Sequence, residues 1–184
     1  MEFAFSSSSP LVVFRGPSGC GKTTLLKIIF GSIDGEISYE ALDSKPNPYI
    51  ILQDDALCPW MTGTQNIQHF LSVNVRDFEH LPLYQHTKSF INKKACKMSF
   101  GQRRLIELLR ALLFGPQLLL LDEPFNYLDS KSRNIFVNEL YNFIKEGNRQ
   151  VVLTDHVRQS FDEVPHEIYT FPDTKPITEL YREE

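Results

Sequence analysis

Cysteine, basic charge and long apolar runs are all scarce in this 184-residue sequence, and each shortage excludes a class of protein. The three cysteines, Cys20, Cys58 and Cys96, are odd in number and lack the paired spacing of a zinc site or a disulfide framework, which fits a reducing compartment such as the cytosol. Lysine and arginine together number 19 against 23 aspartates and glutamates, a net charge of −4. The basic surface of a dedicated nucleic-acid-binding protein is therefore not expected.

No apolar run approaches the roughly 18 residues that a membrane span requires. The N-terminal stretch MEFAFSSSSPLVVF has no basic segment followed by a continuous apolar one, so no signal peptide is predicted. Hydrophobic residues nevertheless make up 42% of the chain, enough for a substantial core. We expect one domain over residues 1–184 that reaches a membrane only through a partner.

Short apolar runs bounded by turn residues predict strands buried on both faces of a parallel sheet, because such strands are apolar throughout rather than alternating. They occupy residues 11–14, 49–52, 118–121 and 151–154. Between them, KTTLLKIIFG and SRNIFVNELYNFIKEG have helical spacing and end at Gly31 and Gly147. This alternation of strands and helices predicts an α/β fold.

The middle of the chain, residues 59–114, has no strand-like run of comparable quality. Thr62 and Gln65 have the spacing of a capping box and predict a helix that extends through Leu71. We interpret about residues 57–113 as a helical insertion in the α/β core. The run of four serines near the N-terminus predicts a turn between two short strands.

A glycine-rich loop follows the first predicted strand and opens a helix, which is the context that the G-x-x-x-x-G-K-[ST] pattern requires. In such a loop several N–H groups converge on the β-phosphate, Lys22 reaches the β- and γ-phosphates, and the Thr23 hydroxyl ligates Mg²⁺. The alternative is a glycine-rich turn with an exposed lysine. The predicted nucleotide-binding residues are Gly16, Pro17, Ser18, Gly19, Cys20, Gly21, Lys22, Thr23 and Thr24.

An acidic pair, Asp122 and Glu123, follows the apolar run LLLL. At the end of a buried strand, Asp122 can hold the shell of the magnesium ion, and Glu123 can orient or deprotonate the water that attacks the γ-phosphate. Alone, an acidic pair in this position is commonly a helix N-cap. Together with the glycine-rich loop, it favours a nucleotide hydrolase.

These two motifs, with MSFGQ between them, resemble the nucleotide-binding domain of ATP-binding cassette (ABC) proteins from Val12 to about Phe161. The resemblance implies a P-loop NTPase core with a buried, mostly parallel sheet flanked by helices, and a helical insertion that carries the signature motif. It also implies that Gln53, at the end of the strand in IILQDD, contacts the magnesium ion and the attacking water. Without that order of motifs, a glutamine after a strand is usually a surface residue.

The family's signature, usually Leu-Ser-Gly-Gly-Gln, corresponds to residues 98–102, which we name the signature turn. Ser99 and Gln102 are also spaced as a capping box, and a capped helix start is an anion site, so both interpretations hold together. The resemblance implies that Ser99, Gly101 and Gln102 close over the γ-phosphate of ATP bound to a second cassette. Phe100 replaces the family's first glycine. Either it reshapes the dimer interface or its side chain points away from it, which we favour because GQRRLIELLRALL matches the signature helix without a gap.

Charged residues form a stripe on this predicted helix, opposite its leucines. The stripe consists of Arg103, Arg104, Glu107 and Arg110, and three lysines, Lys93, Lys94 and Lys97, precede it. We expect the locally basic residues Lys93, Lys94, Lys97, Arg103 and Arg104 to form a solvated helical face near a phosphate.

Two further stretches follow the acidic pair. FNYLD resembles the family's D-loop, with Asp129 as its acidic residue, and VVLTDH resembles the strand and switch histidine, His156, which the family places on the γ-phosphate. The rival interpretation makes Asp155 a helix N-cap and leaves His156 merely exposed. The other histidines have no partner spacing and are expected on the surface; they are His69, His80, His86 and His166.

Lys22 lies near the N-terminus of the sequence, so the family's antiparallel strands are expected in reduced form, and the aromatic residue that stacks on adenine has no evident counterpart. Phe3 or Phe5 takes that place, or each is a buried strand residue. The preference for ATP is therefore implied by the resemblance alone.

The resemblance implies an ATPase, the ATP-binding subunit of an ABC transporter, which binds MgATP between two cassettes and hydrolyses it to drive solute transport. Its partners would be a second cassette, in a homodimer or a heterodimer, and a separate transmembrane permease that holds it on the cytoplasmic face of the membrane. QDDALCPWMTGTQNI resembles a stretch of transporter ATPases for nitrate, sulfonate, taurine and related small solutes, in which Trp60 and Pro59 would help to shape the groove for the permease. Alternatively, Trp60 anchors the core of the helical insertion.

Two other functions are alternatives. A soluble ABC protein that acts on nucleic acid or ribosomes would need tandem cassettes, a coiled-coil insertion or a basic face, and this sequence has one cassette and an excess of acid. A regulatory module that binds nucleotide poorly would be separated from an active enzyme by an ATPase assay.

Overall fold

The structure is a computed structural model that describes residues 2–4, 9–34, 36–38, 47–155, 161, 164–171 and 181–182. The chain divides into two compact units. One, the sheet unit, comprises Met1–Gln53, Pro116–Pro124 and Ile144–Glu184, and the other, the helical unit, comprises Asp54–Gly115 and Phe125–Phe143.

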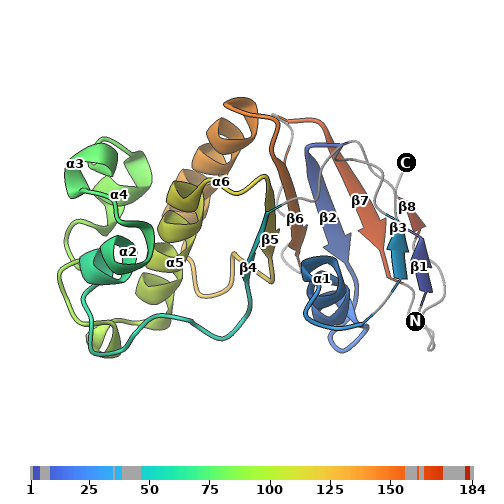
Figure 1. Ribbon diagram of the computed structural model, residues 1–184, viewed down its shortest axis with the longest axis horizontal. Coiled ribbons are helices and arrows are strands. Elements are labelled where there is room, and N and C mark those ends of the chain that lie inside the picture. The colour runs from blue at the N-terminus through green and yellow to red at the C-terminus, as the bar shows by residue number, and fades with distance from the viewer. Residues whose placement is uncertain are drawn as a thin grey trace. The chain divides into compact units, whose positions relative to one another are not determined.

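A six-stranded sheet forms the centre of the sheet unit, in the order β4-β5-β6-β2-β7-β8 (Figure 1). The first five strands are parallel, and β8 is antiparallel to β7. The strands are β2 (Leu11–Arg15), β4 (Pro48–Ile51), β5 (Leu118–Leu121), β6 (Gln150–Thr154), β7 (His166–Thr170) and β8 (Tyr181–Arg182). The predicted α/β class with a mostly parallel sheet is thus confirmed.

The four apolar runs form β2, β4, β5 and β6, and the central three of these, β5, β6 and β2, are buried along almost their whole length. Strand β7 was not predicted. Its sequence HEIYT mixes polar and apolar residues, and all five residues are half-buried, so it lacks the continuous apolar run that marks the other strands.

Helix α1 (Lys22–Phe30) packs its apolar residues on the sheet. Leu25 and Leu26 are fully buried in a cluster with Val12 and Phe14 of β2, and Gly31 ends the helix as predicted. This packing fixes the start of α1 against the end of β2, because the helix leaves the strand through a loop of only a few residues.

A second, two-stranded sheet joins β1 (Glu2–Ala4) to β3 (Glu36–Ser38). The pairing is parallel, whereas the reduced N-terminal strands were expected to be antiparallel. The chain passes through β2 and α1 between these two strands, and a connection that contains a helix allows parallel pairing, which a tight hairpin does not.

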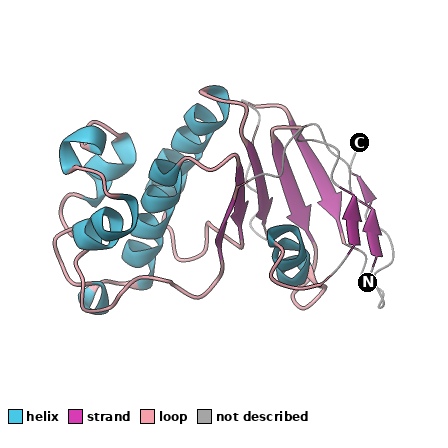
Figure 2. Cartoon of the chain, in the orientation of Figure 1, coloured by secondary structure: helices cyan, strands magenta, loops and turns pink. Residues whose placement is uncertain are grey.

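The helical unit contains the signature turn, and Figure 2 shows it as helices joined by loops. Its elements are α2 (Gly63–Leu71), α3 (Val75–Phe78), α4 (Pro82–Thr87), the 3₁₀ helix η1 (Ala95–Lys97), α5 (Phe100–Phe114) and α6 (Ser130–Lys145), whose last two residues belong to the sheet unit. Helix α5 packs against α2 and α4 through buried leucines and Ile106. The predicted capping box of Thr62 and Gln65 starts α2. None of the described helices is long and apolar enough to cross a membrane.

Candidate functional site

The glycine-rich loop lies between strand β2 and helix α1. The nine predicted residues form this loop and the first turn of the helix; they are Gly16, Pro17, Ser18, Gly19, Cys20, Gly21, Lys22, Thr23 and Thr24. Gly21 is the N-cap residue of α1 and has a φ of 106°, a left-handed conformation that glycine adopts without steric cost. The strand, loop and helix that the motif requires are therefore present.

The ammonium group of Lys22 lies inside this loop. Its Nζ donates hydrogen bonds to the carbonyl oxygens of Gly16 and Pro17, both at 2.8 Å, and lies 3.7 Å from Sγ of Cys20. Lys22 is only 5% exposed, which excludes the alternative of a turn with an exposed lysine. A buried cation whose neighbours are carbonyl dipoles favours an anion beside it.

The start of α1 adds a second attraction for an anion. The first turn of the helix carries no acidic residue. The N–H groups of a first turn have no partner within the helix, and the helix dipole places partial positive charge there. The loop and the start of α1 together form a site suited to a phosphate group.

Asp122 meets Thr23 beside this loop. Asp122 directly follows β5 and is 1% exposed, and the Thr23 hydroxyl donates a hydrogen bond to its Oδ2 at 2.7 Å. Parallel strands end at one edge of the sheet, which brings these two residues together although 99 positions separate them. Hydroxyl and carboxylate oxygens are ligands that Mg²⁺ accepts, so the pair fits a magnesium ion.

Among the residues that the structure describes, no group of three or more His, Cys, Asp or Glu side chains could hold a metal ion. Mg²⁺ commonly takes one or two protein ligands and completes its shell with water and substrate phosphates. The two oxygens of Thr23 and Asp122 therefore suit an ion that arrives with a nucleotide.

No motif pointed to Thr154, the last residue of β6, yet it joins both acidic residues. Its hydroxyl donates a hydrogen bond to Oδ1 of Asp122 at 2.8 Å and accepts one from the backbone N–H of Glu123, also at 2.8 Å. Thr154 is fully buried. Leu121 pairs with Leu153 in the parallel register, which sets Thr154 level with Asp122. A polar residue that closes an apolar strand beside the acidic pair is the signal that would have identified it.

The alternative interpretation, in which the acidic pair is a helix N-cap, is wrong. The next helix, α6, begins only at Ser130, and Asp122 is bonded to two hydroxyl groups instead. Glu123 has a φ of 48°, a left-handed conformation that is unusual outside glycine. Such strain persists where the surroundings enforce it, and it is frequent at functional sites.

Gln53 follows β4 by two residues and is exposed. Strand β4 is the parallel neighbour of β5, so Gln53 and Asp122 lie beyond the same edge of the sheet. Asp155 is buried, and its N–H donates a hydrogen bond to the carbonyl of Phe14. His156 and Phe5 lie outside the described residues, and Phe3 belongs to β1.

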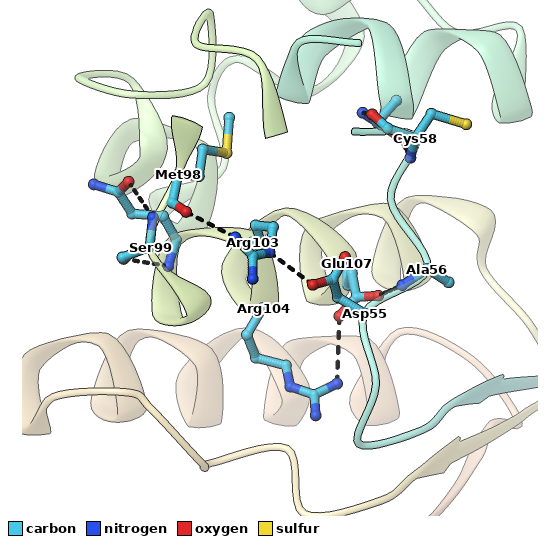
Figure 3. Close-up of polar contacts among 10 residues, drawn as sticks. Asp55, Ala56, Cys58, Met98, Ser99, Arg103, Arg104 and Glu107 are labelled. Carbon is cyan, nitrogen blue, oxygen red and sulfur yellow. Dashed lines mark hydrogen bonds and ion pairs between the residues drawn. The ribbon is translucent and has the colours of Figure 1, made fainter. Parts of the chain in front are cut away.

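The signature turn lies at the start of α5, in the helical unit. Ser99 is the N-cap residue, and its Oγ accepts a hydrogen bond from the Gln102 N–H at 3.2 Å, while Oε1 of Gln102 accepts one from the Ser99 N–H at 3.1 Å (Figure 3). The predicted capping box is therefore confirmed. The first turn of α5 carries no acidic residue, so this helix start also suits an anion. Gly101 lies between the two capping residues.

Phe100, the departure from the family's glycine, is the first residue of α5 and is 62% exposed. Its ring packs against the ring of Tyr127, and the guanidinium group of Arg103 lies over it. The aromatic side chain thus has defined neighbours on the surface of the helical unit.

Of the five basic residues expected on a solvated face, Lys93, Lys94 and Lys97 are exposed and Arg103 is half-buried, but Arg104 is buried, so for Arg104 the prediction was wrong. The rest of the charged stripe of α5 is buried as well. Arg104, Glu107 and Arg110 are between 2% and 6% exposed. Glu107 accepts a hydrogen bond from the Ala56 N–H at 2.6 Å and an ion-paired one from Arg104 at 3.3 Å (Figure 3). Burial raises the pKa of Glu107, and these two partners offset part of that effect. The stripe holds the segment after Gln53 rather than facing water.

Asp129 caps helix α6. Its Oδ1 accepts a hydrogen bond from the backbone N–H of Ser132 at 2.7 Å, and its carbonyl accepts one from the N–H of Arg133. The bond from the Ser132 N–H, helped by the Ser132 hydroxyl, lowers the pKa of Asp129. The acidic residue of the FNYLD stretch therefore has a structural role in the helical unit.

Two of the four remaining histidines, His86 and His166, are half-buried rather than on the surface as predicted. Nε2 of His86 lies 2.9 Å from the Ser132 hydroxyl, which links α4 to the start of α6. His166 belongs to β7, where it is half-buried, and its Nδ1 lies 3.1 Å from the carbonyl of Val164. The other two, His69 and His80, are exposed.

A hollow of about 410 Å³ opens on the helical unit. Its lining residues are Trp60, Met61, Gln65, Gln68 and His69. Trp60 is 67% exposed, so it does not anchor the core of the insertion, and the alternative that placed it on a surface groove agrees with its position.

Known proteins resemble this chain in sequence and in fold. The family model described as ABC transporter matches residues 4–126. The taurine import ATP-binding proteins TauB of Shigella dysenteriae and Escherichia coli are each 35% identical to the chain over 162 residues, a match that covers 81% of this chain and 64% of each relative. The chain thus spans less than two thirds of the length of the curated relatives it matches.

Solved structures share the fold. A dimeric ATP-binding cassette in a post-hydrolysis state, bound to ADP and phosphate, superposes with a TM-score of 0.75 at 22% identity and covers 97% of this chain and 86% of its own. RNase-L inhibitor superposes with a TM-score of 0.73 at 19% identity, over 95% of this chain and 34% of its own.

Proposed function

This chain belongs to the ABC transporter family, whose model matches residues 4–126, and on that premise we propose that it is the ATP-binding subunit of an ABC transporter. The resemblance noted in the sequence is confirmed by that match. In the proposal the chain binds MgATP, hydrolyses it and drives the uptake of a solute. The observation that carries it is the buried Lys22 ammonium beside the bonded pair of Thr23 and Asp122.

The loop between β2 and α1 binds the phosphates. Lys22 exchanges its contacts with the Gly16 and Pro17 carbonyls for the β- and γ-phosphates, since charged acceptors bind an ammonium group more strongly than carbonyl oxygens do. The N–H groups of the loop and of the first helical turn, including Thr24, donate to the phosphate oxygens.

Magnesium is held by the oxygens of Thr23 and Asp122, with Gln53 added from the end of β4. The ion would neutralise charge that develops on the phosphates. Asp122 stays fixed because Thr154 holds its second oxygen.

Glu123 orients or deprotonates the water that attacks the γ-phosphate. Its backbone is fixed by the bond to Thr154, so its carboxylate is positioned from a single backbone conformation. His156, which follows β6 and Asp155 in the sequence, contacts the γ-phosphate in the same proposal.

A second cassette completes each site. The signature turn of one chain, through Ser99, Gly101 and Gln102, closes over the γ-phosphate of ATP bound to the other chain, with Asp129 nearby. The start of α5, whose first turn carries no acidic residue, attracts that anion. Each chain then holds half of each site, and ATP favours the closed dimer because it binds that state more tightly. Residues 1–184 act as one ABC ATPase domain, in which about residues 57–113 form the helical insertion.

A transmembrane permease is the second partner and keeps the chain on the cytoplasmic face of the membrane. The hollow beside Trp60 and Met61 offers an apolar and polar lining for a helix of that permease. Support for transport over the soluble alternatives comes from the relatives, which are named as taurine import ATP-binding proteins.

The test is nucleotide binding and hydrolysis by the purified chain. We expect Lys22→Ala to abolish MgATP binding in calorimetry, while the matched control Lys27→Ala, on the last turn of the same helix, leaves it unchanged. Unchanged affinity in Lys22→Ala would refute the phosphate site. Binding without turnover by the wild-type chain would instead favour a regulatory module.

A further inference from the structure

Two large aromatic side chains lie together on the surface of the helical unit. Phe100 is 62% exposed and Tyr127 is 67% exposed, and their ring centroids are 5.4 Å apart with an interplanar angle of 30°. Single exposed apolar side chains are ordinary, whereas adjoining ones are more often part of an interaction site. Phe100 starts α5 directly after Ser99, and Tyr127 lies two residues before Asp129.

Arg103 joins this pair to a third segment. Its guanidinium carbon lies 4.4 Å from the centroid of the Phe100 ring, within the range of a cation–π interaction. The same guanidinium group donates from Nε to Oδ2 of Asp55 at 2.7 Å and from Nη1 to the carbonyl of Met98 at 2.8 Å (Figure 3). The side chain of Arg103 is 16% exposed, so these three neighbours fix it in one orientation. Asp55 follows Gln53 by two residues.

The backbones of the two segments also meet. A Cβ atom placed on Gly101 would overlap the carbonyl oxygen of Tyr127, so the first turn of α5 lies directly on the chain at Tyr127. Tyr127 has a φ of 63°, a conformation that is a true outlier for a bulky residue. Such a conformation persists where the surroundings hold it. Here the Leu128 N–H donates a hydrogen bond to the Phe125 carbonyl and closes a turn around Tyr127, and Phe100 and Gly101 pack against that turn.

We propose that Phe100, Tyr127 and Arg103 form an aromatic clasp that holds the signature turn, the segment before Asp129 and Asp55 as one rigid piece, and that Phe100 is a positioning residue for ATP hydrolysis. A glycine in place of Phe100 offers no ring to Tyr127 and none to Arg103. The clasp makes up for the missing glycine by ordering these three segments before a second cassette arrives, which lowers the entropy lost on closure. This inference rests on the proposed function.

The clasp predicts a specific division of effects. Binding of MgATP to one chain uses the loop beside Lys22, in the sheet unit, so its affinity does not depend on Phe100. Closure of the dimer uses the signature turn and does depend on it. Loss of the ring therefore lowers turnover and leaves the affinity of the single chain unchanged.

Three variants of the clasp test this in the full chain. Phe100→Leu keeps apolar bulk but removes the ring. Tyr127→Gly removes the second ring and suits the left-handed backbone conformation at that position. Phe100→Tyr keeps an aromatic ring. The matched control is Phe70→Leu. Phe70 is 53% exposed and has Arg110 5.0 Å from its ring centroid, so it reproduces the arginine and phenylalanine pairing on another helix.

We expect Phe100→Leu and Tyr127→Gly each to lower turnover at saturating ATP by roughly 5- to 50-fold, with MgATP affinity by calorimetry unchanged. The Phe100→Leu/Tyr127→Gly double variant should fall no further than the lower single variant, because both remove the same clasp. Phe100→Tyr and Phe70→Leu should retain wild-type turnover, and thermal unfolding identifies any variant that fails to fold.

Turnover in Phe100→Leu within twofold of the wild type, or single effects that multiply in the double variant, would overturn the clasp. A loss of turnover in Phe100→Tyr as large as the loss in Phe100→Leu would overturn it as well. A wild-type chain that does not hydrolyse ATP would overturn the proposed function and this inference together. That outcome is distinguishable, because failure of the inference alone leaves wild-type turnover intact.

Discussion

The Thr154 hydroxyl is the group that bonds to both acidic residues, so its removal tests whether their arrangement depends on it. Thr154→Val keeps the shape of the side chain and replaces the hydroxyl with a methyl group. The replacement leaves Oδ1 of Asp122 and the N–H of Glu123 without that partner, at a residue that is fully buried. A buried polar group left unsatisfied costs about 1–3 kcal/mol, so the two together predict a loss of about 2–6 kcal/mol in the free energy of unfolding.

The same change should reach catalysis. Without its bond to Thr154, the left-handed backbone of Glu123 can relax, and its carboxylate loses its fixed position. We expect turnover to fall at least about tenfold, which corresponds to about 1.4 kcal/mol, and the affinity for MgATP to change less because Lys22 is untouched.

Chemical denaturation and steady-state ATPase assays measure the two effects, and Thr154→Ser is the matched control. Serine keeps the hydroxyl and loses one methyl group, so it should restore most of the turnover. The reasoning fails if Thr154→Val unfolds within about 0.5 kcal/mol of the wild type and hydrolyses ATP at the wild-type rate.

Two further predictions concern the helical unit. Because the pKa of Asp129 is lowered in the folded state, its contribution to stability is present above the unfolded pKa and is lost as the pH falls toward the lowered pKa of the folded state. Asp129→Ala should remove this part of the acid dependence of the free energy of unfolding. Asp129→Asn, whose amide oxygen still caps α6, should remove it with a smaller loss of stability at neutral pH. Glu107→Leu should destabilise the chain by about 3 kcal/mol or more in denaturation, since it leaves the buried Arg104 and the Ala56 N–H without their carboxylate; stability equal to the wild type would show that the buried stripe contributes nothing.

Features written in short, local patterns could be predicted from the sequence. The glycine-rich loop, the capping boxes at Thr62 and Ser99, and the buried strands depend on residues close together in the chain, and each lies where it was expected within about two residues. The fold class followed from the order of those elements.

Features that depend on contacts between distant segments could not be predicted. The role of Thr154 depends on the register of β5 and β6, and the burial of Glu107 depends on the segment around Ala56 packing on α5. The charges of α5 had the periodicity of an exposed stripe, but their partners lie about fifty residues earlier in the chain. His86 likewise gained its partner, Ser132, from another helix.

The central claim is that this chain hydrolyses MgATP within a closed pair of cassettes, and Glu123→Gln tests it most directly. Glutamine keeps the shape of Glu123 but cannot act as a base, so turnover should fall at least about 100-fold while nucleotide still binds. Size-exclusion chromatography with MgATP should then show a dimer accumulating in this variant and a monomer without nucleotide. Wild-type turnover, or a variant that stays monomeric at saturating MgATP, would contradict the account.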